Sequence, residues 1–371
     1  MAGWENLYRN LAKMSDRAQA HNKEQQIRKG AVGMWKKGII ILSLLACVFI
    51  GYPFYSSQNN SQPLKVYVIF QEDEGRVLLE KFKKATGQPY EMIRMSSGEA
   101  SYHLLSMDKS GIDVVLGGPA DLHEQLKNNG KLVRYSSPMR DSIPARYKDK
   151  EGFWTGMYMG ALAIGVNQKV WRHDPLLASL PLPQQYEDLL RPELKGKIEI
   201  PDPETSGTGY TLLASLAQQR GENEAVRLML ALKKQSSSTT FAGITSAQRL
   251  AVGDVAAVVN FLGDQLRFAN SGYDISSYIP PQAGWEIGAV SVLKNGNNTA
   301  AAKKLVDFVL SRDVQTDYMN TAFSFPVLPD IAVHPLLSPV KLENLLATYR
   351  FDTAAQHRES LLNKWRSAKE E

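Results

Sequence analysis

Residues 201–216 read PDPETSGTGYTLLASL, a turn that passes through Ser206, Gly207, Thr208 and Gly209 into an apolar run. The first N–H groups of a helix have no partner within the helix, and the helix dipole places partial positive charge at the same end. Glycine removes the Cβ that would keep an oxyanion away, and serine and threonine hydroxyls add donors. The stretch therefore predicts a helix start that faces a small anion.

Strand and helix patterns alternate on both sides of this stretch. Short apolar, β-branched runs that predict strands occupy residues 64–70, 90–95, 112–118, 160–167, 256–261 and 284–293. Apolar residues at helical spacing predict helices at residues 74–85, 122–128, 222–234 and 299–311. Such alternation predicts an α/β fold with mostly parallel sheets covered on both faces. A chain of 371 residues is also long enough for two lobes.

Three predicted strand-to-helix junctions are built from small residues: Ser96 to Gly98, the pair Gly117 and Gly118, and Thr205 to Gly209. Ligands of parallel sheets bind at the carboxyl ends of the strands, so the three junctions are expected to face one cleft. None of them contains Lys or Arg, and we expect main-chain amides to hold an anion without cationic side chains. Ordinary helix capping is the alternative explanation for each junction taken singly.

Two carboxylates stand in apolar surroundings. Asp264 follows a predicted strand, and Glu286 lies inside the run GWEIGAV. A buried carboxylate needs a partner, because burying an unpaired charge is costly. Hydroxyl groups of a bound sugar or polyol would serve, and a salt bridge for Glu286 and a helix cap for Asp264 are the alternatives.

Signatures of other functions are missing from the sequence. The six histidines show no HExxH or similar spacing, and no GxSxG elbow or phosphate-binding GxxxxGK[ST] loop occurs. In the exported part of the chain, no basic patch is interleaved with aromatic residues. We therefore expect a protein that is not an enzyme, with no catalytic residues, metal, cofactor or nucleic-acid partner.

The N-terminal part differs from the remainder. Residues 1–37 hold eight Lys or Arg and three Asp or Glu, whereas the rest of the chain has 35 of each. Residues 38–55 are uncharged and mostly apolar, long enough to cross a bilayer. We favour a retained anchor behind a cytoplasmic tail over a secretory signal that starts at Met34. Residues 56–63 predict a linker to an exported domain.

A family resemblance rests on blocks found in order along residues 64–345. These blocks are MSSGEA, DVVLGGPAD, GMYMGALAIGVN, YEDLLRPELKGKIEIPDPETSGTGYTLLASL, NFLGD, GWEIGAVSVLKNGNN and FSFPVLPD. They resemble the periplasmic solute-binding proteins of ABC importers, in the branch that binds ferric iron, hexose phosphates, phosphonates and phosphoglycerate.

The resemblance implies a type II periplasmic binding fold, in which two lobes close on a ligand about a two-strand hinge. Lobe 1 would comprise residues 64–162 and 284–371, and lobe 2 residues 163–283, with hinge strands at 160–167 and 286–293. The ligand-binding residues that it implies are Ser96, Ser97, Gly98, Glu99, Gly117, Gly118, Thr205, Ser206, Gly207, Thr208, Asp264 and Glu286. Sugar-phosphate binders place a histidine before the aspartate, where this chain has Gly263.

The implied function is capture of a small phosphorylated anion in the periplasm, next to the inner membrane. The partner would be an ABC permease or a sensor histidine kinase, as for phosphoglycerate transport regulatory proteins. Ferric-iron binding and, less favoured, hydrolysis on the same scaffold are the alternatives. Iron-binding relatives use paired tyrosines, and this chain has no adjacent tyrosine pair.

Overall fold

The computed structural model describes residues 62–281, 283–341, 345 and 349–370. The expected basic tail (1–37), the anchor or signal segment (38–55) and most of the linker (56–63) lie outside the described residues. Within the described part of the chain, no helix combines the length and the apolar character needed to cross a bilayer.

The strands are β1 (Leu64–Val68), β2 (Tyr90–Arg94), β3 (Val114–Pro119), β4 (Leu132–Val133), β5 (Trp154–Asn167), β6 (Ile198–Pro201), β7 (Ser238–Thr240), β8 (Ala257–Phe261), β9 (Ile275–Tyr278), β10 (Trp285–Leu293) and β11 (Phe325–Pro326). The helices are α2 (Glu72–Thr86), α3 (Ser97–Ser106), α4 (Ala120–Asn128), α5 (Gln168–His173), α6 (Gly207–Arg220), α7 (Glu222–Gln235), α8 (Gly243–Val252), α9 (Leu262–Asn270), α10 (Thr299–Val309), α11 (Arg312–Ala322) and α13 (Phe351–Glu370).

The sheet is mixed, with the order β2-β1-β3-β10-β5-β8-β6-β7. β1 pairs in parallel with β2 and β3, and β6 pairs in parallel with β7 and β8. β10 is antiparallel to β3 and β5, and β5 is antiparallel to β8. The prediction of mostly parallel sheets is therefore wrong. β5 pairs with strands in both halves of the sheet, and β10 leads the chain back to the first half. Both strands are therefore antiparallel to their neighbours in the strand order.

β5 divides the sheet into two strand groups. Its residues 154–161 pair with β10, and its residues 162–166 pair with β8. The first strand group is thus β2, β1, β3, β10 and the start of β5, and the second is the end of β5 with β8, β6 and β7. The expected division into lobes at residues 162 and 284 stays a prediction, and the change of partner on β5 falls at the same position.

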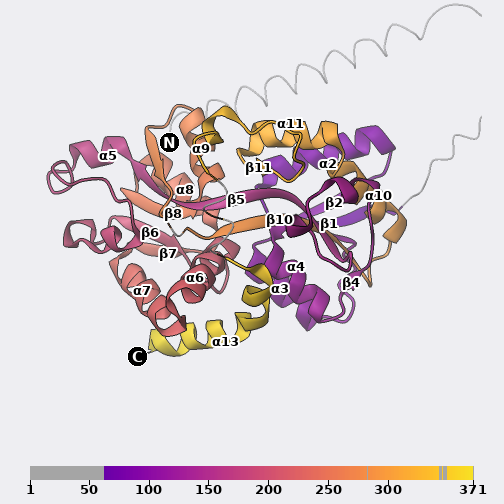
Figure 1. Ribbon diagram of the computed structural model, residues 1–371, viewed down its shortest axis with the longest axis horizontal. Helices are drawn as coiled ribbons and strands as arrows, with labels where there is room; N and C mark the ends of the chain where they lie inside the picture. The colour runs from indigo at the N-terminus through magenta and orange to yellow at the C-terminus, as the bar shows by residue number, and fades with distance from the viewer. Residues whose placement is uncertain (1–61, 282, 342–344, 346–348, 371) are drawn as a thin grey trace, which may run out of the picture. The chain divides into compact units, whose positions relative to one another are not determined.

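Helices cover both faces of the first strand group (Figure 1), with α2, α10 and α11 on one face and α3 and α4 on the other. Alternation along β1 explains this arrangement, because successive strand residues point to opposite faces. Leu64, Val66 and Val68 pack in the core that contains α2 residues such as Phe82. Tyr67, in between, packs in a second core with residues of α3 and α4.

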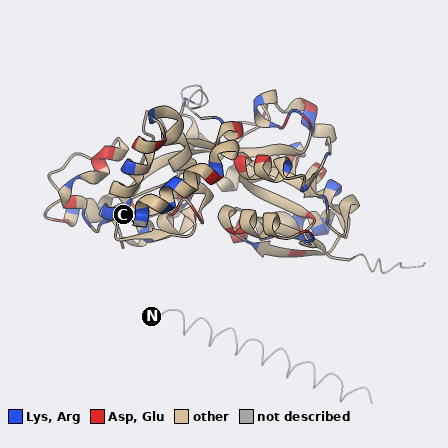
Figure 2. Cartoon of the chain, turned by 90° about the horizontal axis from the view of Figure 1, so that it is seen from below, with Lys and Arg blue, Asp and Glu red and all other residues tan. Residues whose placement is uncertain are grey.

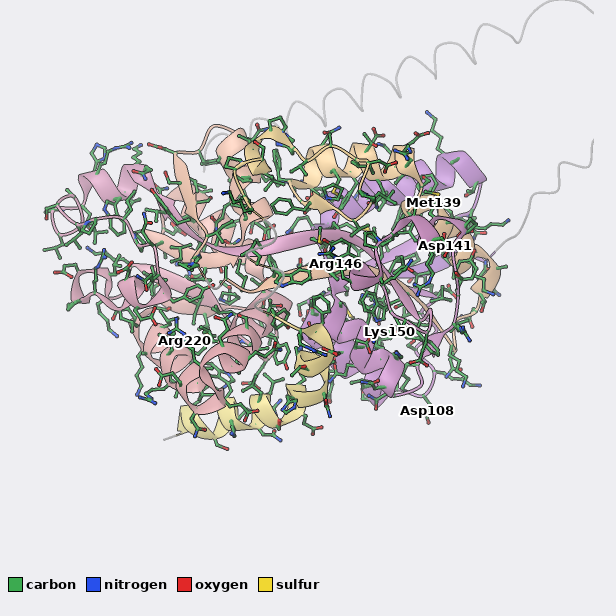
Figure 3. The ribbon with its side chains drawn as sticks, in the orientation of Figure 1. Asp108, Met139, Asp141, Arg146, Lys150 and Arg220 are labelled. Carbon is green, nitrogen blue, oxygen red and sulfur yellow. The ribbon has the colours of Figure 1, made fainter. Side chains whose placement is uncertain are left out.

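The segment 136–152 contains two short 3-10 helices, η1 (Pro138–Ser142) and η2 (Ala145–Tyr147). Figure 3 places Met139 and Lys150 of this segment on the side of β1 and β2, far from Arg220 at the end of α6. β5 then begins at Trp154, six residues before the expected strand start at residue 160.

Charges of both signs are interspersed along the helices (Figure 2), in keeping with the even balance of the chain after residue 37. Such a surface lacks the single-sign field that steers nucleic acid.

The C-terminal helix α13 lies against α4 of the first strand group and against α6 and α7 of the second. Arg358 forms a buried ion pair with Asp121 of α4, at 2.9 Å between Nη1 and Oδ2. Its guanidinium also stacks on the ring of Tyr210 of α6, 3.9 Å from the centroid. One side chain of α13 therefore joins the two parts of the fold.

We predict that Arg358→Ala lowers the free energy of unfolding by about 3–5 kcal/mol, since it leaves the buried Asp121 carboxylate unpaired. The control is Arg76→Ala, which removes an exposed pair with Glu72 and should cost less than about 1 kcal/mol. Denaturant titration measures both. Equal effects of the two substitutions would contradict the role assigned to Arg358.

Candidate functional site

One pocket lies between the two strand groups and is bordered by the starts of six helices. The N-cap residues that line it are Gln71 of α2, Ser96 of α3, Pro119 of α4, Ser206 of α6, Ala242 of α8 and Phe261 of α9. The first N–H groups of a helix have no partner within the helix, and the helix dipole is positive at the same end. The surroundings therefore favour a negatively charged group in this pocket.

The starts of α3 and α6 form the part of the pocket with free hydroxyl donors. Ser97 and Thr208 line the pocket, and each is less than a tenth exposed. Their hydroxyls make no hydrogen bond with any described residue. The Ser206 hydroxyl accepts a bond from Gly209 N–H at 3.3 Å, as an ordinary cap does. Ser97 and Thr208 thus keep their donors for a ligand.

Close contact between these two helix starts requires glycine at position 207. A Cβ at this position would stand 2.3 Å from the Ser97 hydroxyl oxygen, closer than real contacts allow. The same two segments are joined where Gly98 N–H donates to the Thr205 carbonyl, at 3.1 Å. The first and third of the three predicted strand-to-helix junctions therefore meet in one place.

Seven of the twelve predicted ligand residues line the pocket. They are Ser96, Ser97, Ser206, Gly207, Thr208, Asp264 and Glu286. Gly98 and Thr205 do not line the pocket, and the Gly98 N–H donates to the Thr205 carbonyl. The exposed Glu99 does not line the pocket, because its carboxylate forms a capping box with Ser96, accepting from the Ser96 N–H at 2.9 Å and hydroxyl at 2.7 Å.

Gly117 and Gly118 do not line the pocket either, and they shape the end of β3. Their φ angles are +79° and +82°, a region that other residues rarely adopt. A Cβ on Gly117 would strike the ring of Phe70, and one on Gly118 would strike Ile69. Both neighbours line the pocket, so the glycine pair lets the end of β1 reach it.

Arg94, at the end of β2, also lines the pocket. The expectation that no cationic side chain takes part in binding stays a prediction, although this arginine lies at the pocket. Its Nε donates to the Phe70 carbonyl at 3.4 Å, and it has no carboxylate within ion-pair distance among the described residues. A single arginine at a strand end carries no local signal that distinguishes it from a solvated residue, so sequence reasoning did not find it.

Asp264 and Glu286 reach the same pocket from different elements, α9 and β10. Asp264 accepts from Gln71 Nε2 at 2.7 Å and from Asn260 Nδ2 at 3.3 Å. It does not cap α9, which has no side-chain cap. Glu286 is 7% exposed and has no hydrogen bond or salt bridge with any described residue. Neither of the two structural alternatives considered for these carboxylates holds.

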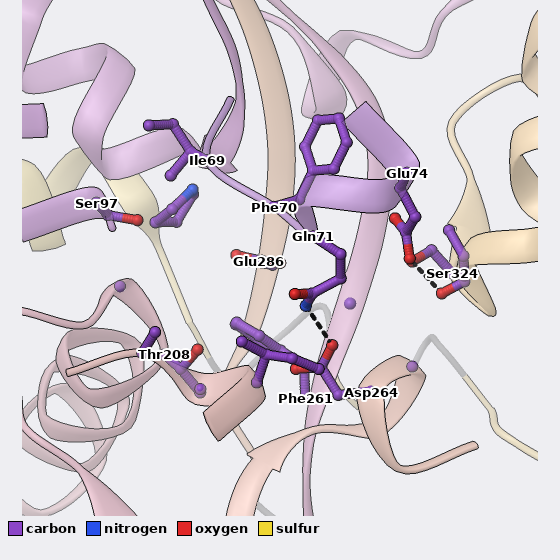
Figure 4. Close-up of a pocket in the computed structure, with 18 of the residues that line it drawn as sticks. Ile69, Phe70, Gln71, Glu74, Ser97, Thr208, Phe261, Asp264, Glu286 and Ser324 are labelled. Atoms are coloured by element: carbon purple, nitrogen blue, oxygen red, sulfur yellow. Dashed lines mark hydrogen bonds between the residues drawn. The ribbon is translucent and has the colours of Figure 1, made fainter. Parts of the chain in front are cut away.

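A third carboxylate, Glu74 in the first turn of α2, also lines the pocket. It pairs with Arg267 of α9 at 2.8 Å and accepts from the Tyr318 hydroxyl at 3.2 Å. Together with the Gln71 to Asp264 bond, this ion pair ties α2 to α9 across the pocket. Figure 4 shows Ser97 and Thr208 on one side, and Glu74 and Asp264 on the opposite side.

Burial controls the titration of these groups. Desolvation raises the pKa of Glu74 to about 8, against the lowering effect of Arg267. Desolvation likewise raises the pKa of Asp264 to about 6, although the bonds from Gln71 and Asn260 oppose it. The pKa of Glu286 lies well above its usual range, chiefly through burial and then through the charge of Asp264. Burial therefore favours the neutral, protonated forms of these carboxyl groups in the ligand-free pocket.

In the described part of the chain, no group of three or more His, Cys, Asp or Glu is arranged to hold a metal ion. Tyr158 and Tyr318 both line the pocket, with ring centroids 5.7 Å apart. Burial and neighbouring carboxylates raise the pKa of both phenols well above the usual value. Both tyrosines are therefore protonated in the absence of a metal.

Comparison with known families decides the broader identity. The family model described as bacterial extracellular solute-binding protein matches residues 109–357. This chain belongs to that family. The family resemblance drawn from the sequence is thereby confirmed.

Individual relatives agree with this assignment. An uncharacterized protein of Haemophilus influenzae is 32% identical over 308 residues, which cover 78% of this chain and 86% of that protein. The structure of the periplasmic binding protein AfuA from Actinobacillus pleuropneumoniae, with exogenous fructose-6-phosphate bound, is 29% identical with a TM-score of 0.75. The match covers 82% of this chain and 97% of AfuA.

The phosphoglycerate transport regulatory protein PgtC of Salmonella typhimurium is 24% identical over 295 residues, which cover 76% of this chain and 70% of PgtC. The type II periplasmic binding fold expected from the sequence is thus present, with a mixed sheet in place of mostly parallel ones.

We predict that the raised pKa of Glu74 makes the ligand-free protein less stable as pH rises from about 4.5 to about 8. In that window the folded chain holds a proton that the unfolded chain has lost, so deprotonation favours unfolding. Thermal melts should show a smaller loss of Tm between pH 5 and pH 8 for Glu74→Gln than for the unchanged protein. The exposed Glu72→Gln is the control and should keep the original slope, and identical slopes in both variants would refute the assignment.

Proposed function

We propose that the protein captures a small phosphorylated anion in the pocket between its two strand groups. The observation that carries the proposal is the junction of α3 and α6, where the free hydroxyls of Ser97 and Thr208 stand in the first turns of the two helices. Such N–H groups and hydroxyls bind tetrahedral oxyanions through directed hydrogen bonds. Arg94 adds a formal positive charge to the same pocket.

Names of relatives support this ligand class. The AfuA structure holds a sugar phosphate, and PgtC is named for phosphoglycerate transport. The remainder of the ligand would contact Asp264 and Glu286, and Glu286 has no hydrogen-bond donor among the described residues. Ligand-dependent closure would follow if the ligand binds the closed arrangement more tightly than an open one.

The proposal includes a location in the periplasm and a partner in the inner membrane, either an ABC permease or a sensor histidine kinase. Mass spectrometry of the mature protein distinguishes the two. Retention of residues 1–55 supports membrane attachment and a sensory partner, whereas a start near residues 56–60 supports delivery to a permease.

Phosphate recognition is tested by titrating the purified protein with sugar phosphates, phosphoglycerates and phosphonates, and with their unphosphorylated counterparts. We predict that only phosphorylated compounds raise Tm and bind in calorimetry. Thr208→Val should weaken binding about 10-fold or more, because a hydrogen bond to a charged group contributes about 1.5–3 kcal/mol. Thr211→Val, on the same helix but outside the pocket, should leave the affinity unchanged.

Two other experimental results would each assign a different function to the protein. A charge-transfer colour on adding ferric salts, with no response to any phosphorylated compound, would establish iron capture. Release of inorganic phosphate from a phosphorylated sugar by the purified protein would establish hydrolysis.

A further inference from the structure

The two strand groups touch each other through main-chain atoms on one side of the pocket, at the start of α9. The helix α9 follows β8 of the second strand group, and Gly263 lies in its first turn. The turn after α11 belongs to the first strand group, because it leads into β11, which pairs with residues 158–159 of β5. A Cβ on Gly263 would stand 2.9 Å from the carbonyl oxygen of Ala322 and 3.0 Å from that of Phe323. A side chain at position 263 would therefore collide with the backbone of the other strand group.

A second contact of the same kind lies on the other side of the pocket, where α3 meets the loop before α6. A Cβ on Gly98 of α3 would stand 2.3 Å from the Glu204 carbonyl oxygen and 2.7 Å from that of Thr205. Gly98 does not line the pocket, and its N–H already donates to the Thr205 carbonyl at 3.1 Å, so it is not available to a ligand. In Figure 4, Ser97 marks this side of the pocket, and Ser324 marks the side of α9 and α11.

Neither glycine is required by the conformation of its own backbone. Gly117 and Gly118 have positive φ angles, whereas Gly98 and Gly263 do not. Both Gly98 and Gly263 lie in helices, a structure in which alanine is intrinsically more favourable than glycine. The reason for glycine at these two positions therefore lies in the opposing strand group.

The turn that approaches Gly263 has an unfavourable backbone conformation. Phe323 has a φ of 47° and a ψ of 44°, and no other described residue apart from glycine has a positive φ. A side chain makes this left-handed region costly, and such residues persist where the surrounding structure holds them in place. The Phe323 ring is buried and packs edge-on against His334, with ring centroids 4.7 Å apart. The fold thus accepts strain in the turn whose carbonyl groups contact α9.

We propose that Gly98 and Gly263 set the affinity for the ligand by allowing the two strand groups to close completely, and that neither acts by binding the ligand. Each contact joins main-chain atoms, which cannot turn aside as a flexible side chain can. An added methyl group at either position would hold the strand groups apart, so the two sides of the pocket could not contact one ligand together. This inference rests on the proposed function, in which the ligand stabilises the closed arrangement.

The test compares Gly98→Ala and Gly263→Ala with the unchanged full-length chain, and D-fructose 6-phosphate and 3-phosphoglycerate are the probes. Calorimetry is expected to show that each variant binds about 10-fold or more weakly, as overpacking of a close contact predicts. The loss should appear mainly as faster dissociation of the probe. The ligand-free Tm should not fall in either variant, because the collision occurs only in the closed arrangement and alanine favours the helix.

The control is Gly296→Ala, which places a methyl group against atoms of the same strand group. A Cβ at this position would stand 2.6 Å from Asp113 Oδ1 and 2.8 Å from Asp113 Cα, beside the start of β3. Gly296 does not line the pocket. This substitution should show the reverse pattern, with a lower ligand-free Tm and an unchanged affinity for the probe.

The remaining results overturn the inference in distinguishable ways. If a probe binds but either Gly98→Ala or Gly263→Ala keeps the original affinity, the inference fails and the proposed function stands. The same conclusion follows if either substitution lowers the ligand-free Tm as Gly296→Ala does, because the contact is then a structural one present without ligand. If the unchanged protein binds neither probe nor any phosphorylated compound of the wider panel, both the inference and the proposed function fail.

Discussion

Six helices of the described chain begin at one pocket, and a single lining arginine accompanies them. The partial charges of helix ends act over about one turn, so the effect depends on how closely these ends approach one another. Gly207 sets that approach, since any side chain there would occupy the position of the Ser97 hydroxyl. The anion site therefore depends on backbone proximity between two segments more than a hundred residues apart in sequence, and side-chain charge is secondary.

The opposite side of the pocket is lined by acidic side chains. Glu74, Asp264 and Glu286 gather there, and among the described residues Glu74 forms an ion pair, with Arg267. Bonds from Gln71 to Asp264 and from Arg267 to Glu74 also join α2 to α9. The groups that would contact the ligand thus also form contacts between the two strand groups. Arg358 of α13 forms a further such contact, because it pairs with Asp121 of α4 and stacks on Tyr210 of α6. Binding and closure would be coupled through shared residues.

Local chemistry made part of this arrangement predictable. The start of α6 and the isolated Glu286 were visible because a glycine-rich turn and a charge in an apolar strand are local patterns. The direction of β5 and β10 was not, since antiparallel pairing depends on distant strands. Glu74 stood among Glu72 and Asp73, an ordinary acidic helix start, and nothing local marked it as buried. The helix α13 was missed although its buried residues Ala354, Leu361 and Trp365 follow helical spacing.

The central claim is that helix N-termini and the hydroxyls of Ser97 and Thr208 hold a phosphoryl group. A crystal structure of the protein grown with a phosphorylated ligand, such as fructose 6-phosphate, examines this most directly. The account predicts phosphoryl oxygens within hydrogen-bond distance of the main-chain N–H groups at the starts of α3 and α6, with the rest of the ligand directed toward Asp264 and Glu286. A phosphoryl group placed among the tyrosines or outside the pocket would contradict it.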